Sequence, residues 1–110
     1  MKSISKELVG ASAVPIILSV LENGDTYGYE ILQRIKKYTD GEVMWQEASI
    51  YPLLKKMENN GLIKSYWKMS KKERPRKYYT LLSDGKEQLE YNKQEWQRLN
   101  GVFEILWNPA

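Results

Sequence analysis

The chain has 110 residues, enough for one packed domain but not for a second independent core. Hydrophobic residues make up 42% of it, and neither cysteine nor histidine is present, which excludes disulfides, cysteine metal sites and the commonest general base. The net charge of +3 is unevenly placed, because residues 62–80 alone hold seven basic side chains and one acidic one. Such a segment indicates a polyanion bound by one face, although a solvated lysine-rich loop explains the charge equally well.

Residues 4–21 are apolar on much of their surface and predict an N-terminal helix. Pro15 would break this helix unless a new first turn begins near Ser12. The apolar run 13–21 is too short to span a bilayer and lacks a signal-peptide cleavage pattern. We therefore expect a soluble, cytoplasmic protein, and residues 22–25 are predicted to form the turn that ends the segment.

A second helix is predicted from Tyr27 to about Tyr38, with Thr26 or Asp25 as its N-cap. Its apolar positions follow helical spacing. They are Ile31, Leu32 and Ile35. Residues 39–41 are expected to stop the helix, and residues 42–45 are predicted to form a short strand.

A third helix is predicted over residues 49–60, with Gln46 or Ser49 as its N-cap. Its apolar residues lie at i, i+3, i+4 and i+7, which predicts a buried stripe. They are Ile50, Leu53, Leu54 and Met57. Pro52 fits only if the helix begins near Ser49, where the missing N–H is not needed. Asn60 and Gly61 are expected to end it.

The pattern then changes from helical to extended. Residues 62–68 and 76–81 are rich in β-forming residues and flank the polar, basic stretch 69–75, which predicts a β-hairpin with a basic loop. Trp67 is expected to pack at the base of this hairpin.

A long last helix is predicted from Ser83, its candidate cap, to about Leu106. Two series with a spacing of seven interleave along it. They are Leu89, Trp96 and Phe103, and Asn92, Leu99 and Leu106. A heptad seam of this kind is typical of a helix that pairs with a partner, so these residues are the predicted dimer interface; packing on the chain's own core is the alternative.

The order of three helices, a basic β-hairpin and a long helix predicts a winged helix-turn-helix, mainly α with a small β-hairpin. Residues 1–82 would form the DNA-binding unit, and residues 83–110 would form a dimerisation helix within the same compact body. A helix-turn-helix places its second helix, here residues 49–60, in the major groove.

The predicted DNA contacts lie on that helix and on the hairpin. Side chains of the helix can bond base edges or phosphates, whereas lysines and arginines of the hairpin would neutralise phosphates. The candidates are Ser49, Tyr51, Lys55 and Lys56 on the helix, and Lys71, Lys72, Arg74, Arg76 and Lys77 on the hairpin. Taken alone, Lys55 and Lys56 are better explained as part of a solvated helix face. Because a basic hairpin flanks the helix, contact of these two lysines with DNA becomes the better explanation.

Four short motifs follow one another along the chain. They are Tyr-Gly-Tyr-Glu-Ile at 27–31, Ala-Ser-Ile-Tyr-Pro-Leu-Leu-Lys-Lys-Met-Glu at 48–58, Asn-Gly-Leu-Ile at 60–63, and Arg-Lys-Tyr-Tyr at 76–79 followed by Leu81 and Gly85. With this order and spacing, the chain resembles the PadR family of winged-helix repressors over roughly residues 8–86. With a single long C-terminal helix, the chain resembles the short subgroup of that family, which includes multidrug-responsive regulators.

The resemblance implies a homodimeric regulator that binds a pseudo-palindromic operator and is released by a small aromatic effector. Tyr27 and Tyr29 fall on the family's Tyr-Gly-Tyr-Glu motif and would support or contact the DNA backbone. Trp96 matches the position at which multidrug-binding members stack planar drugs. Its expected neighbours are Leu8, Ala11, Pro15, Asn100 and Phe103. A tryptophan that merely fills the dimer core is the alternative.

Two other classes of function are an enzyme and a protein-interaction module. An enzyme is disfavoured, because the sequence suggests no nucleophile–base pair, phosphate-binding glycine loop or metal-ligand cluster, and we expect no catalytic residues, cofactor or metal. A winged helix that serves only as a protein-interaction module, with its wing on an acidic partner, stays open. Salt-dependent binding with a preference for one DNA sequence would count against that module.

Overall fold

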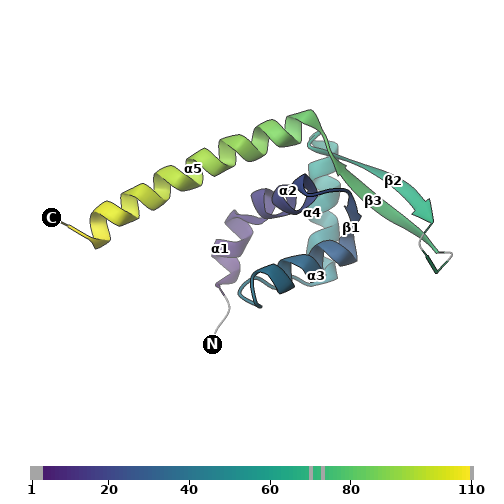
Figure 1. Cartoon of the computed structure of the whole chain (residues 1–110), viewed down its shortest axis with the longest axis horizontal. Helices are drawn as coiled ribbons and strands as arrows, with labels where there is room; N and C mark the ends of the chain where they lie inside the picture. Colours follow the sequence, from purple (N-terminus) through teal and green to yellow (C-terminus); the bar gives the residue numbers. More distant parts are fainter. Residues whose placement is uncertain (1–3, 70, 73, 110) are drawn as a thin grey trace.

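A computed structural model of the chain describes residues 4–69, 71–72 and 74–109. Its elements are α1 (Lys6–Ala11), α2 (Ala13–Glu22), β1 (Thr26–Tyr27), α3 (Gly28–Tyr38), α4 (Glu47–Asn59), β2 (Ile63–Met69), β3 (Pro75–Leu81) and α5 (Ser83–Trp107). The hairpin and the far end of α5 point to opposite ends of a molecule 60 Å long (Figure 1). This mainly helical architecture with a small antiparallel sheet confirms the predicted winged-helix fold.

The N-terminal segment forms two helices that meet at Ser12. Ser5 caps α1 by accepting a hydrogen bond from the Leu8 N–H at 3.4 Å. Because α2 begins at Ala13, Pro15 lies in a first turn where its missing N–H is not needed. The prediction that Pro15 requires a fresh helix start near Ser12 is confirmed.

A third strand, β1, joins the hairpin in a three-stranded sheet of order β1-β3-β2. Thr26 pairs with Tyr79 and Tyr27 with Tyr78. The prediction that Thr26 or Asp25 caps the following helix is therefore wrong, because strand pairing extends the backbone here and α3 begins only at Gly28. Two residues are too few for an alternating pattern to reveal a strand.

Residues 42–45 do not form the predicted strand. Val43 is buried, and its N–H donates to the Thr39 hydroxyl at 3.1 Å. The segment is thus held as an irregular connection by a bond to the end of α3.

The start of α4 agrees with one of the two predicted caps, Gln46, and not with the other, Ser49. The helix begins at Glu47, and Gln46 occupies the N-cap position without a side-chain capping bond. Ser49 therefore lies inside the first turn and Pro52 in the helix interior, where it has no N–H for the carbonyl of Ala48. The expectation that Pro52 stands close behind the helix start is wrong.

The core lies where α2, α3 and α4 meet the base of the sheet. The buried stripe predicted for α4 is confirmed, with Leu53 only partly buried. The largest side chains that are fully buried include Ile17, Leu18, Ile31, Ile50, Leu54, Met57, Ile63 and Leu89. Leu89 comes from α5, so the first part of that helix belongs to the same core.

The N-terminus of α5 packs directly on the connection between α4 and β2. A Cβ atom on Gly85 would collide with the carbonyl oxygen of Leu62, so this contact needs a glycine. Leu82 holds the N-cap position and Ser83 is the first helical residue, so the prediction of Ser83 as the cap is wrong.

Within the described ranges, no helix combines the length and apolar character that a membrane span requires.

Glu58 ties α4 to the hairpin. Its carboxylate accepts hydrogen bonds from the Ser65 hydroxyl and from the Ser65 N–H, the latter at 3.1 Å. The Nζ of Lys77 lies 4.0 Å from the same carboxylate. The bond from the Ser65 hydroxyl, with a smaller contribution from Lys77, holds the pKa of Glu58 below its ordinary value. A charged Glu58 therefore stabilises the join between α4 and the hairpin.

Because the folded-state pKa is depressed, this stabilisation is present above the unfolded-state pKa and is lost as pH falls through the folded-state value. We expect Glu58→Gln to lower the free energy of unfolding by about 1 kcal/mol at pH 7. The difference from the wild type should shrink below about pH 4. Urea unfolding at both pH values measures it, with Glu87→Gln at an exposed position of α5 as the control. An equal loss at both pH values would mean that the charge of Glu58 is not what stabilises the join.

Candidate nucleic-acid interface

One side of α4 faces solvent while the opposite side is buried in the core. Since Ile50, Leu54 and Met57 point inward, helical spacing turns the intervening polar side chains outward. The predicted DNA contacts of α4 are all exposed: Ser49, Tyr51, Lys55 and Lys56. Glu47, Ala48, Pro52 and Asn59 of the same helix are exposed as well.

A hollow of about 410 Å³ opens where the N-terminus of α3, the exposed side of α4 and the hairpin meet. We call it the aromatic hollow, after its lining of tyrosine and tryptophan rings with interspersed basic groups. It is lined by Tyr27, Gly28, Tyr29, Tyr51, Lys55, Trp67, Arg76, Lys77 and Tyr79. Six predicted DNA contacts from β1, α3, α4 and β3 therefore share one surface: Tyr27, Tyr29, Tyr51, Lys55, Arg76 and Lys77.

Tyr51 lies across the first residue of α3. A Cβ atom on Gly28 would stand 2.6 Å from Cε1 of the Tyr51 ring, closer than two carbon atoms can approach. Partial burial, reinforced by the nearby charge of Glu47 and opposed by Arg76, raises the pKa of the Tyr51 phenol. The phenol is therefore neutral at pH 7 and has a proton to donate to an anion.

The hairpin brings its basic residues to two places. Arg76 and Lys77 of β3 border the aromatic hollow. Lys71, Lys72 and Arg74 are exposed in the connection between β2 and β3, beyond the hollow. The predicted wing contacts thus extend from the hollow to the end of the hairpin, as a winged helix needs to reach the neighbouring backbone.

Trp67 was wrongly predicted to pack at the base of the hairpin. It is 69% exposed and borders the aromatic hollow. In the hairpin, Trp67 of β2 pairs with Lys77 of β3. The buried residue Tyr79 pairs with Ser65, two positions closer to the core. At Trp67 the hairpin no longer packs on the core. A count of β-forming residues predicts the strand but not the position at which this packing ends.

A second hollow of about 260 Å³ lies in the seam between α2 and α5. We call it the seam hollow; it is lined by Ser12, Pro15, Ile16, Ser19, Leu89, Lys93 and Trp96. Of the predicted ligand residues, Pro15 and Trp96 border it. Leu8 and Ala11 of α1, and Asn100 and Phe103 farther along α5, do not line it.

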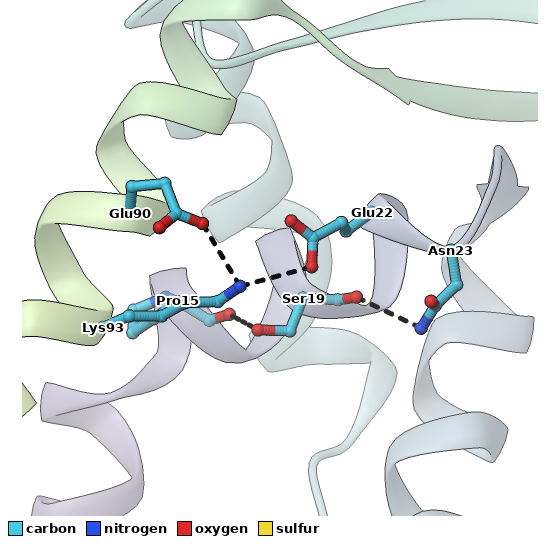
Figure 2. Close-up of polar contacts among 6 residues, drawn as sticks. All are labelled: Pro15, Ser19, Glu22, Asn23, Glu90 and Lys93. Atoms are coloured by element: carbon cyan, nitrogen blue, oxygen red, sulfur yellow. Dashed lines mark hydrogen bonds and ion pairs between the residues drawn. The ribbon is translucent and has the colours of Figure 1, made fainter. Parts of the chain in front are cut away.

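Polar contacts organise the edge of the seam hollow (Figure 2). The Nζ of Lys93 stands between the carboxylates of Glu90 and Glu22, at 3.3 and 3.4 Å. The bond to Glu90, and then the charges of both carboxylates, raise the pKa of Lys93. Behind it, the Ser19 hydroxyl donates to the Pro15 carbonyl at 2.7 Å. The edge of this hollow therefore carries two carboxylates and one ammonium.

The predicted dimer residues divide into two groups along α5. Leu89 is only 1% exposed within the chain's own core, so it has almost no surface to offer a partner. Asn92 and Trp96 are half-buried. Leu99 and Leu106 are exposed, and the Phe103 ring stacks on Trp107 at 4.6 Å on the projecting end of the helix.

Comparison with known proteins agrees with this geometry. Residues 17–91, which run from α2 into α5, match the sequence model of the transcriptional regulator PadR-like family. A transcriptional regulator from Clostridium thermocellum is similar in structure, with a TM-score of 0.82 and 32% identity over 90% of this chain and 96% of that one.

Two further solved structures are similar along their whole length. A PadR-like transcriptional regulator from Bacillus cereus has a TM-score of 0.82 and 31% identity, over 96% of this chain and 100% of that one. A PadR family transcription regulator from Clostridium difficile has a TM-score of 0.75 and 37% identity, over 88% of this chain and 99% of that one. The matched family, the winged-helix fold and the basic face around α4 lead to one conclusion: the chain belongs to the PadR-like family of DNA-binding transcriptional regulators.

Proposed function

We propose that this protein is a repressor that binds a pseudo-palindromic operator as a homodimer. The observation that carries the proposal is the aromatic hollow, in which predicted DNA contacts from α3, α4 and the hairpin converge. Basic side chains line it on both the α4 side and the hairpin side. A polyanion that follows this surface would meet positive charge from two elements at once.

In this proposal, α4 enters the major groove with its exposed side. Ser49 and Lys56 can reach base edges, whereas Tyr51 and Lys55, which border the aromatic hollow, are better placed for the backbone. α4 carries no arginine, so discrimination between bases would depend on weaker contacts than the arginine–guanine pair. The hairpin would fix the register by binding phosphates.

The far half of α5 supports a dimer. Its exposed apolar residues are Leu99, Val102, Ile105, Leu106 and Trp107. Large apolar side chains that gather on an exposed helix end are typical of an interface. A second copy of the helix is the natural partner, since a pseudo-palindromic operator calls for a two-fold dimer whose two copies of α4 lie about 34 Å apart, in successive major grooves. Occupation of a promoter by the dimer would block polymerase.

A mobility-shift assay on DNA upstream of the protein's own gene tests the proposal. We expect a discrete complex of two chains per duplex that survives competitor DNA. Replacement of both Lys71 and Lys72 by Glu should weaken binding and reduce the dependence of log K on log salt by roughly one for each lost phosphate contact.

The matched control replaces Lys36 and Lys37, two exposed lysines in the last turn of α3, by Glu. This end of α3 is opposite the end that borders the aromatic hollow, so binding should change less. An unchanged salt slope in the hairpin variant would remove the wing from the proposal. Binding without any sequence preference would favour a winged helix that serves a protein partner.

A small aromatic effector is proposed for the seam hollow. Pro15, Ile16 and Leu89 give it an apolar lining, and the half-buried Trp96 adds a flat aromatic surface. In a two-fold dimer, the Trp96 rings of the two copies could sandwich a planar ligand. Such a ligand would release DNA only if it binds one arrangement of the dimer more tightly than the other. The favoured arrangement would be the one in which the spacing of the two winged-helix units does not fit the operator.

Trp96→Ala should weaken the binding of a planar aromatic dye by about fivefold or more, since an offset stack contributes on the order of 1 kcal/mol beyond burial. Trp96→Phe should keep most of the affinity, because it keeps an aromatic face. Calorimetric titration measures both, with Tyr38→Ala, at a 69% exposed position at the end of α3, as the control. Full affinity in Trp96→Ala would place the ligand site elsewhere.

A further inference from the structure

Three tyrosines form a row across the outer face of the sheet. In the strand register, Tyr78 of β3 stands between Tyr27 of β1 and Tyr66 of β2. The next residue, Tyr79, is buried, and neighbouring residues of a strand point to opposite faces. The tyrosine row, Tyr27, Tyr78 and Tyr66, therefore lies on the face turned away from the core.

The rings of this row are in contact with one another. Tyr27 and Tyr78 meet edge to face with centroids 5.4 Å apart, and Tyr66 and Tyr78 stack at 5.8 Å. The Tyr66 hydroxyl donates to the Asp25 carboxylate at 2.8 Å, and this bond raises the pKa of Tyr66. The row is thereby fixed to the turn that follows α2.

Two basic side chains lie on the rings. The guanidinium carbon of Arg76 is 4.4 Å from the Tyr27 centroid, and the Nζ of Lys68 is 5.2 Å from the Tyr78 centroid. These two residues are directly opposite in the register of β2 and β3, where like charges repel. The faces of two separate rings give each cation a favourable place in spite of that repulsion.

We propose that the tyrosine row positions Arg76 and Lys68 as a pair of phosphate contacts beside the groove that α4 enters. This inference rests on the proposed DNA binding. Arg76 borders the aromatic hollow together with Lys55, so a phosphate held there would lie between the hairpin and α4. Tyr27 and Tyr78 are positioning residues in this arrangement.

The physical gain is preorganisation. Arginine and lysine have long side chains whose freedom is lost when they bind an anion. A side chain already resting on a ring has lost part of that freedom in the free protein, so less is lost on binding. The rings thus raise DNA affinity through the two cations that they position.

The test is a double-mutant cycle between Tyr27 and Arg76, read as operator affinity at fixed salt. Tyr27→Leu should weaken binding about two- to fivefold, the range expected for one exposed cation–ring contact. Tyr27→Phe keeps the ring and should bind like the wild type. In an Arg76→Ala background, Tyr27→Leu should have no further effect. Tyr91→Leu, which removes an exposed tyrosine of α5, is the matched control.

The free protein provides a second measurement. In NMR spectra, the Arg76 side-chain protons should be shifted upfield by the Tyr27 ring and should lose that shift in Tyr27→Leu. Additive effects of Tyr27→Leu and Arg76→Ala, or no ring-dependent shift, would overturn the inference while the proposed function stands. A wild-type protein that binds no DNA would instead overturn the proposed function, and this inference with it.

Discussion

The close packing of Tyr51 on Gly28 holds the proposed DNA-binding face together. A glycine at the first position of α3 lets the ring of an α4 residue lie where a Cβ atom would otherwise stand. The N-termini of α3 and α4 can then approach each other beside β3, and the aromatic hollow forms between them. The Tyr-Gly-Tyr-Glu motif and the Ser-Ile-Tyr-Pro motif, separate in sequence, are thus two halves of one contact.

Polar bonds then set the hairpin against this face. Glu58 holds β2 to α4 through Ser65, and Tyr66 is bonded to Asp25 in the turn that follows α2. α2 also forms one wall of the seam hollow, where Glu22 meets Lys93 of α5. α2 and the turn after it therefore contact both the proposed effector site and the hairpin, which gives a physical route by which one could influence the other.

Much of this architecture could be predicted from sequence, because it rests on long periodic patterns. The stripe Ile50 to Met57 and the two basic strands identified α4 and the hairpin. The short strand β1 was missed, because pairing with Tyr78 and Tyr79 is a tertiary contact that two residues cannot signal. The exposure of Trp67 and the burial of Leu89 were missed for a related reason: only the three-dimensional fold determines where the hairpin leaves the core and where α5 joins it.

The most direct test of this account is the operator affinity of Gly28→Ala. The added methyl group would displace the Tyr51 ring, which is 42% exposed and has room to move, so the fold should survive with little loss of stability. We expect affinity to fall by about tenfold, or ~1.4 kcal/mol. Gly10→Ala, whose new Cβ atom would meet nothing within 4 Å, should bind normally. A folded Gly28→Ala variant with wild-type affinity would contradict the account.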